Sequence, residues 1–138
     1  MTNPQEQLQS GQEIMFKASF IEKHLQELSE KFEYISQQLS ELEGFSNDLK
    51  SMKTLKDKEI FASLGRGIYA KAFCKEKDLF INAGSGVIVK KTPEEALGII
   101  NSQMKSFYEA KTNLAMQLEA YKRLMTETLA ELEKSKRK

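Results

Sequence analysis

The sequence predicts a mainly α-helical fold with a small β segment: a long antiparallel helical coiled-coil hairpin with two β-hairpins between its helices. Apolar residues recur at alternating intervals of three and four from Ala18 to Leu49, and again from Leu97 to Leu132. This period places one narrow apolar stripe on each helix, here called the seam, and such a stripe packs against a partner helix. Between the two stretches the apolar period changes to two, as in β-strands.

The two helices are expected over residues 5–52 and 93–135, and a polar connector over residues 53–58 follows the first. The second helix has a clear start signal. Thr92 can cap it, Pro93 suits its first turn, and Glu95 completes a capping box. A chain of 138 residues is long enough for one ordinary domain, so we expect a single domain over residues 1–138.

Residues 59–91 predict two β-hairpins, because alternating runs flank a Gly-Arg-Gly turn at 65–67 and a Gly-Ser-Gly turn at 84–86. Apolar side chains occupy both faces of these strands. A two-stranded hairpin alone is marginally stable in water, and its edges expose unpaired backbone groups. We therefore expect this segment to pair with strands of other chains. The apolar residues assigned to this oligomerisation surface are Ile60, Phe61, Leu64, Ile68, Leu79, Ile81, Val87 and Val89.

Large apolar residues outside the seam gather towards the free ends of the helices, away from the strands. Tyr34 is the only one in residues 22–44, whereas residues 8–20 contain four. Antiparallel pairing places residues 8–20 beside the last turns of the second helix. Exposed apolar surface at such a tip marks an interaction site, and packing into a widened seam is the alternative. The residues assigned to binding at the tip, with Leu132 also in the seam, are Leu8, Met15, Phe16, Phe20, Leu124, Leu129 and Leu132.

Composition argues against nucleic acid and membrane partners. The 21 basic and 20 acidic residues nearly balance, and lysines on strands serve to deter edge aggregation. No apolar run approaches the length of a membrane span, and the N-terminus lacks a signal-peptide core. We therefore expect a cytoplasmic protein.

The sequence also offers no support for an enzyme. The glycine turns precede strands rather than a helix, so they do not match a phosphate-binding loop. His24 and Cys74 are the only histidine and cysteine, so a metal site or a Cys–His pair lacks partners. We interpret His24 as a solvated helix-face residue and Cys74 as a small packing residue. We expect no catalytic residue, no metal and no cofactor.

The order of these elements resembles the alpha-type subunits of the prefoldin family. The resemblance is carried by residues 64–69 (Leu-Gly-Arg-Gly-Ile-Tyr), 84–87 (Gly-Ser-Gly-Val) and 92–96 (Thr-Pro-Glu-Glu-Ala), and it extends over nearly the whole chain. Two hairpins between the helices, rather than one, are similar to the alpha class. The resemblance implies a heterohexamer of two alpha-type and four beta-type subunits, with strands in a β-barrel platform. It also implies ATP-independent holding of unfolded client proteins at the tips and their transfer to a group II chaperonin.

Two functions are compatible with these observations. The first is a chaperone subunit that holds non-native proteins. The second is a structural coiled-coil adaptor or scaffold that binds one fixed partner. Exposed Phe and Met at the tip favour the chaperone, because such side chains adapt to varied partners.

Overall fold

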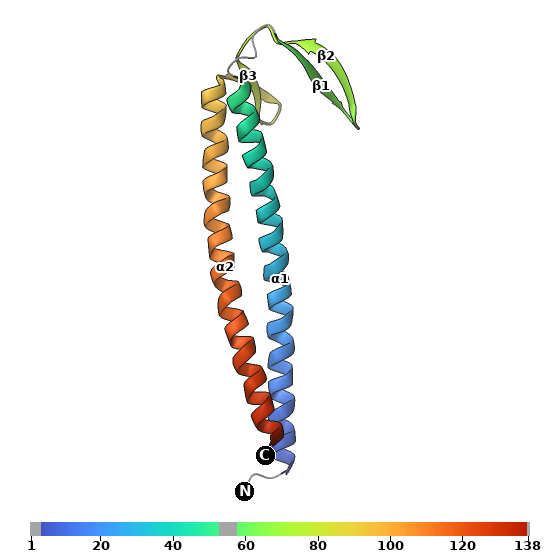
Figure 1. The fold of residues 1–138 in the computed structure, drawn as a ribbon, viewed down its shortest axis with the longest axis vertical. Helices are drawn as coiled ribbons and strands as arrows, with labels where there is room; N and C mark the ends of the chain where they lie inside the picture. Colours follow the sequence, from blue (N-terminus) through green and yellow to red (C-terminus); the bar gives the residue numbers. More distant parts are fainter. Residues whose placement is uncertain (1–3, 53–57, 138) are drawn as a thin grey trace. The chain divides into compact units, whose positions relative to one another are not determined.

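The structure, a computed structural model, describes residues 4–52 and 58–137. Two long helices lie at the two ends of the chain, and four strands lie between them in the sequence (Figure 1). This architecture confirms the predicted fold class. Residues 53–57 of the expected polar connector lie outside the described residues. The elements in chain order are α1 (Pro4–Ser51), β1 (Glu59–Gly65), β2 (Ile68–Phe73), β3 (Leu79–Gly84), β4 (Val87–Lys91) and α2 (Pro93–Arg137).

The chain divides into two compact units, and α1 and α2 contribute to both. The arm unit comprises Met1–Gln38 and Phe107–Lys138, and the strand unit comprises Leu39–Ser106. Whether these units behave as the single domain expected over residues 1–138 stays a prediction.

Within the arm unit, α1 and α2 run antiparallel. His24 of α1 contacts Tyr121 of α2, with 4.5 Å between ring centroids. Further along α1, the Phe32 ring lies 5.6 Å from the Nζ atom of Lys111, which comes earlier in α2. Partner positions on α2 therefore move towards its N-terminus as positions on α1 advance, as the sequence predicts.

The seam supplies the buried residues of both helices. Ile21 is only 1% exposed, and a fully buried aliphatic side chain of this size contributes about 1.5–3 kcal/mol. Two polar positions that interrupt the seam, Ser46 and Thr128, are also buried. Thr128 meets its hydrogen-bonding requirement locally, because its hydroxyl donates to the Leu124 carbonyl at 2.7 Å. The buried apolar residues are Ile21, Leu28, Leu39, Leu49, Ala96 and Leu118.

The start of α2 follows the predicted capping pattern. The backbone N–H of Glu95 donates to Thr92 Oγ1 at 3.1 Å, and the N–H of Ala96 donates to the Thr92 carbonyl at 3.0 Å. Pro93 occupies the first position and is buried. These bonds satisfy donors that every helix leaves unpaired in its first turn.

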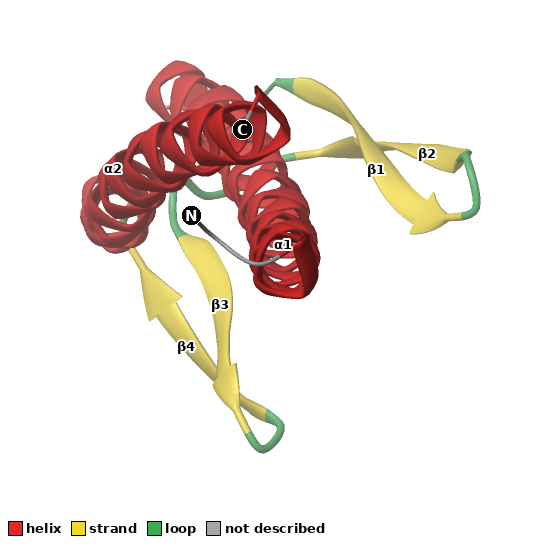
Figure 2. Ribbon diagram, turned by 90° about the horizontal axis from the view of Figure 1, so that it is seen from below, coloured by secondary structure: helices red, strands yellow, loops and turns green. Residues whose placement is uncertain are grey.

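The four strands form two separate antiparallel hairpins, β1–β2 and β3–β4 (Figure 2). The central turn residues all have positive φ: Arg66 and Gly67 at 54° and 78°, and Ser85 and Gly86 at 53° and 77°. Positive φ at both central positions defines the type I′ turn that matches the twist of paired strands. Each hairpin also has a register shift on the first strand just before its turn.

Replacing glycine by alanine is expected to lower stability in the turns and to raise it in the helices. Gly67→Ala or Gly86→Ala places a Cβ at a positive φ and is expected to lower hairpin stability by about 1–2 kcal/mol. Gly44→Ala or Gly98→Ala, where a helical Cβ meets nothing within 4 Å, is expected to raise helix stability by about 0.5–1 kcal/mol. Amide hydrogen exchange of the strands and helices measures both effects, and a stabilising change at Gly67 would contradict the turn assignment.

Candidate functional site

The first turns of α1 present an apolar surface on the side that faces away from α2. Phe16 is 83% exposed and Phe20 68% exposed, while neighbouring Ile21 is buried. With 3.6 residues per turn, Phe16 lies opposite the seam, whereas Leu8 and Met15 lie on its flank and are 69% and 60% exposed. All four residues predicted for the α1 part of the tip are therefore accessible. We call Leu8, Met15, Phe16 and Phe20 the tip surface.

The three α2 residues assigned to the tip differ from one another in exposure. Leu129 is about half exposed, whereas Leu124 and Leu132 are half-buried beside or in the seam. The main exposed surface at the tip is therefore carried by α1, with Leu129 as the α2 contribution. Met116 is also well exposed on α2.

His24 connects the tip surface to the helix pair. Its ring stacks on Phe20, with centroids 6.3 Å apart and an interplanar angle of 2°, and it also contacts Tyr121. His24 Nδ1 lies 3.9 Å from a carboxylate oxygen of Glu27. The interpretation of His24 as a solvated helix-face residue is therefore incomplete, because its ring also stacks against the Phe20 ring. The four-residue spacing of Phe20 and His24 is the sequence signal that would have indicated this contact.

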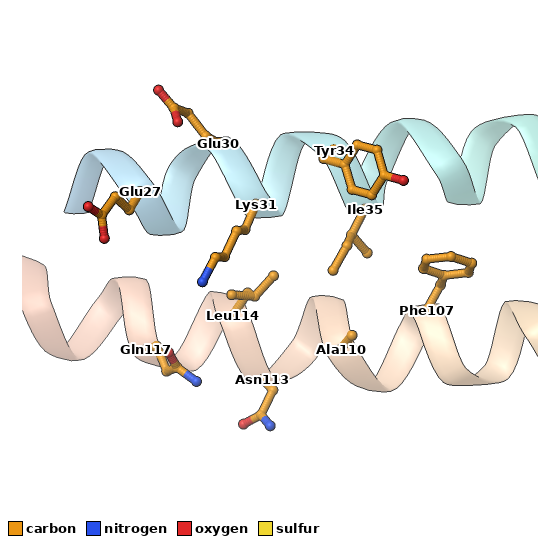
Figure 3. Close-up of a pocket in the computed structure, with 10 residues that line it drawn as sticks. All are labelled: Glu27, Glu30, Lys31, Tyr34, Ile35, Phe107, Ala110, Asn113, Leu114 and Gln117. Atoms are coloured by element: carbon orange, nitrogen blue, oxygen red, sulfur yellow. The ribbon is translucent and has the colours of Figure 1, made fainter. Parts of the chain in front are cut away.

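An open groove of about 700 Å³ lies between α1 and α2 in the middle of the arm unit. In Figure 3, Ile35 and Lys31 point from α1 towards α2, while Glu30 points away from it. Ala110 lines the groove together with Phe107 and Leu114, and its small side chain between these two larger ones was the available sequence signal. The lining residues are Glu27, Glu30, Lys31, Tyr34, Ile35, Phe107, Ala110, Asn113, Leu114 and Gln117.

The strand residues assigned to oligomerisation divide into exposed and half-buried groups. Exposed members are Phe61, Leu64, Ile68 and Val87, and half-buried members are Ile60, Leu79, Ile81 and Val89. The structure adds four exposed residues that the sequence analysis did not assign: Tyr69, Phe73, Phe80 and Ile88. Exposed apolar surface of this density on two-stranded hairpins is typical of an interface.

An ion pair connects the two strands of the first hairpin, and in the second hairpin Lys90 of β4 pairs with carboxylates in the segment just before β3. Lys71 lies 3.3 Å from Glu59 in the first hairpin. In the second, Lys90 lies 3.0 Å from Glu76 and 3.5 Å from Asp78. The hydrogen bond and charge of Glu76, with a smaller effect of Asp78, raise the pKa of Lys90 above its usual value. All these groups are accessible to solvent, so the pairs add little stability by themselves.

Within residues 4–52 and 58–137, His, Cys, Asp and Glu form no group of three that could hold a metal ion. Neither described helix contains a stretch long and apolar enough to cross a membrane. The surfaces available for function are therefore the tip, the groove and the hairpins.

Comparison with known proteins agrees with this architecture. A family model described as "Prefoldin subunit" matches residues 21–138. A solved chain of filamentous PFD from Methanocaldococcus jannaschii, studied by cryo-electron microscopy, has a TM-score of 0.66 and 18% sequence identity. The similarity covers 87% of this chain and 98% of that chain. No curated protein matches the sequence significantly.

Substitutions at Phe16, in the tip surface, and at Ile21, in the seam, are expected to change the free energy of unfolding by different amounts. Phe16→Ala is expected to change the free energy of unfolding by less than about 0.5 kcal/mol, because the ring is largely in solvent. Ile21→Ala is expected to cost about 2–5 kcal/mol, because it leaves a cavity in the seam. Urea denaturation of both variants measures the difference, and an equal loss in both would show that Phe16 packs against other groups in solution.

Proposed function

Because the chain belongs to the prefoldin family, a family of non-enzymatic chaperones, we propose that it is an alpha-type subunit of an ATP-independent chaperone. In this proposal the assembled chaperone holds unfolded polypeptides at the tips of its coiled coils. It then delivers them to a group II chaperonin. The lone cysteine, Cys74, is in keeping with work in the reducing cytoplasm.

The observation that carries the proposal is the exposed tip surface of α1. Leu8, Met15, Phe16 and Phe20 would cost solvation free energy in a helix that served only to pair with α2. Flexible Met and flat Phe side chains suit binding to many different apolar segments. The side chains around them are polar and carry both signs of charge, with Glu13 on one side and Lys17 and Lys23 on the other.

Holding at one tip is expected to be weak, since few apolar side chains take part and ordering an unfolded client offsets much of their contribution. Several tips on one scaffold raise the effective concentration of binding sites. The hairpins provide the means of assembly in this proposal, because exposed strand edges pair readily with other chains. The partners proposed are four beta-type subunits with two copies of the present chain. The similar M. jannaschii chain comes from a filamentous PFD, which supports assembly into larger complexes here as well.

Removing the tip surface is expected to abolish holding without abolishing assembly. The test variant carries Phe16→Ser, Phe20→Ser and Leu129→Ser together, and suppression of aggregation is followed with several unrelated denatured proteins. We expect most of the activity to be lost, because both exposed Phe rings and Leu129 are removed from the tip, although Leu8 and Met15 remain.

The matched control carries Phe45→Ser, Ile99→Ser and Tyr108→Ser, three large side chains that are 41–47% exposed elsewhere on the helices. It should keep its holding activity. Undiminished holding by an intact assembly of the tip variant would overturn the tip assignment. Binding to a single protein among all those tested would favour a fixed adaptor instead.

The assembly proposal predicts a mass well above that of one chain when the protein is mixed with a beta-type subunit. Native mass spectrometry of the mixture is expected to show two copies of this chain and four of the partner. A stable monomer with well-protected strand amides in the presence of the partner would reject strand-mediated assembly, because its edges would then be satisfied without neighbours.

A further inference from the structure

His24 lies at the boundary between the tip surface and the helix pair. Its ring stacks parallel to the Phe20 ring and also packs against Tyr121 of α2. The His24 side chain is 36% exposed, so its ring nitrogens can exchange protons with solvent. It is the only histidine in the sequence. Because an imidazole ordinarily changes charge between about pH 5 and pH 8, the ring beside Phe20 can be charged at one end of this range and neutral at the other.

Few charged groups lie around the His24 ring. Among the α1 residues three or four positions away, only Glu27 is charged, and its carboxylate lies 3.9 Å from His24 Nδ1. On α2 the ring contacts Tyr121, and a phenol stays uncharged where an imidazole titrates. Glu27 is therefore the charged group that faces the ring. The α2 residues three or four positions from Tyr121 are all uncharged: Gln117, Leu118, Leu124 and Met125.

The fixed charges around the tip surface balance. Glu13, Lys17 and Lys23 line the depressions beside its two phenylalanine rings. Together with Glu27 they make two carboxylates and two ammonium groups. Carboxylates and ammonium groups ordinarily keep their charges over the range in which an imidazole titrates. Protonation of His24 therefore turns a balanced cluster into one with a single net positive charge.

We propose that His24 makes client binding at the tip surface selective for charge: with its imidazole protonated, apolar client segments that carry carboxylates bind in preference to segments that carry lysines. The inference rests on the proposed function, because it concerns the regulation of client binding at the same surface. A client that covers Phe20 brings its own neighbouring side chains close to the ring that stacks on Phe20. The added charge attracts carboxylates among them and repels ammonium groups.

One added charge has an effect large enough to measure. At about 8 Å and an effective dielectric constant of about 60, a pair of unit charges alters an affinity roughly threefold. Acidic and basic clients shift in opposite directions, so the ratio of their affinities changes about tenfold. Protonation also alters the stacking on Phe20 and the hydration of the site, but these contributions are common to both clients. The affinity ratio therefore reports the charge of His24.

A pair of labelled peptides tests the proposal. The peptides have blocked ends, share one apolar, aromatic-rich sequence and differ only in a Glu or a Lys beside it. Fluorescence anisotropy measures the binding of each peptide to the full-length chain at about pH 7.5 and about pH 5.5, on either side of the ordinary imidazole titration. The Glu and Lys side chains of the peptides are largely ionised at both pH values.

For the original chain, the ratio of Glu-peptide to Lys-peptide affinity is expected to rise about tenfold from the higher to the lower pH. Added salt should reduce this rise, because exposed charges are then screened. The ratio should not change with pH in the His24→Gln variant, which lacks a titrating ring. The same holds for His24→Phe, which keeps an aromatic ring next to Phe20.

A matched control moves the imidazole along the same side of α1. It carries His24→Gln with Gln38→His, two heptads further along the helix and about 21 Å away at about 1.5 Å per residue. This distance exceeds the screening length of about 10 Å in about 0.1 M salt. The affinity ratio is therefore expected to stay independent of pH, although the chain again contains one histidine.

The outcomes separate this inference from the proposed function. An affinity ratio that is independent of pH in the original chain, while both peptides bind, would overturn the inference and leave the proposed function standing. An equal rise of the ratio in the His24→Gln variant would assign the titration to another group and would overturn it as well. If neither peptide bound at either pH, the proposed function would be rejected and the inference with it.

Discussion

The narrowness of the seam is the constraint on which the rest of this structure depends. An apolar repeat with alternating intervals of three and four buries one stripe of each helix, and the antiparallel partner covers only that stripe. Ile21 and Thr128 are almost completely buried, whereas side chains a few residues away are in solvent. Most large apolar residues outside the seam are thus exposed, with Leu124 beside the seam as a half-buried exception. The positions of such residues are informative for this reason.

In the strand unit too, little protein surface is available to cover the apolar side chains. A two-stranded hairpin has two faces and two outer edges, and α1 and α2 offer limited apolar surface to either. The turns are nevertheless well specified, with positive φ values and a side-chain hydrogen bond repeated in both hairpins. Turns that are fixed by local interactions, together with exposed apolar faces, suit a segment that assembles with other chains. The hairpins hold their shape from local interactions, and in the proposed assembly they gain burial from neighbouring chains.

The tip surface, which we propose to bind clients, is partly ordered by contacts with the helix pair. Phe20 stacks on His24, which in turn contacts Tyr121 of the opposite helix. In the proposed function, a ring held in this way would lose less conformational freedom on binding a client, so more of its burial would contribute to affinity. Among the described residues, Phe16 and Met15 take part in no such ring contact. The tip therefore combines one supported aromatic ring with apolar neighbours, and the flexible Met among them suits varied partners.

The sequence by itself determined the kinds and order of elements, the antiparallel pairing of the helices, the capped start of α2 and the positions of both turns. These features depend on local periods and on residue types such as Thr92 and Gly67, which act within a few positions of themselves. Only the tertiary structure decided that Leu124 and Leu132 are half-buried, that His24 supports Phe20, and that a groove opens beside Ala110. It also decided the repeated ion pairs of the hairpins. These properties depend on the angle at which each side chain leaves its helix or strand and on the residue opposite it, and a period along one chain specifies neither.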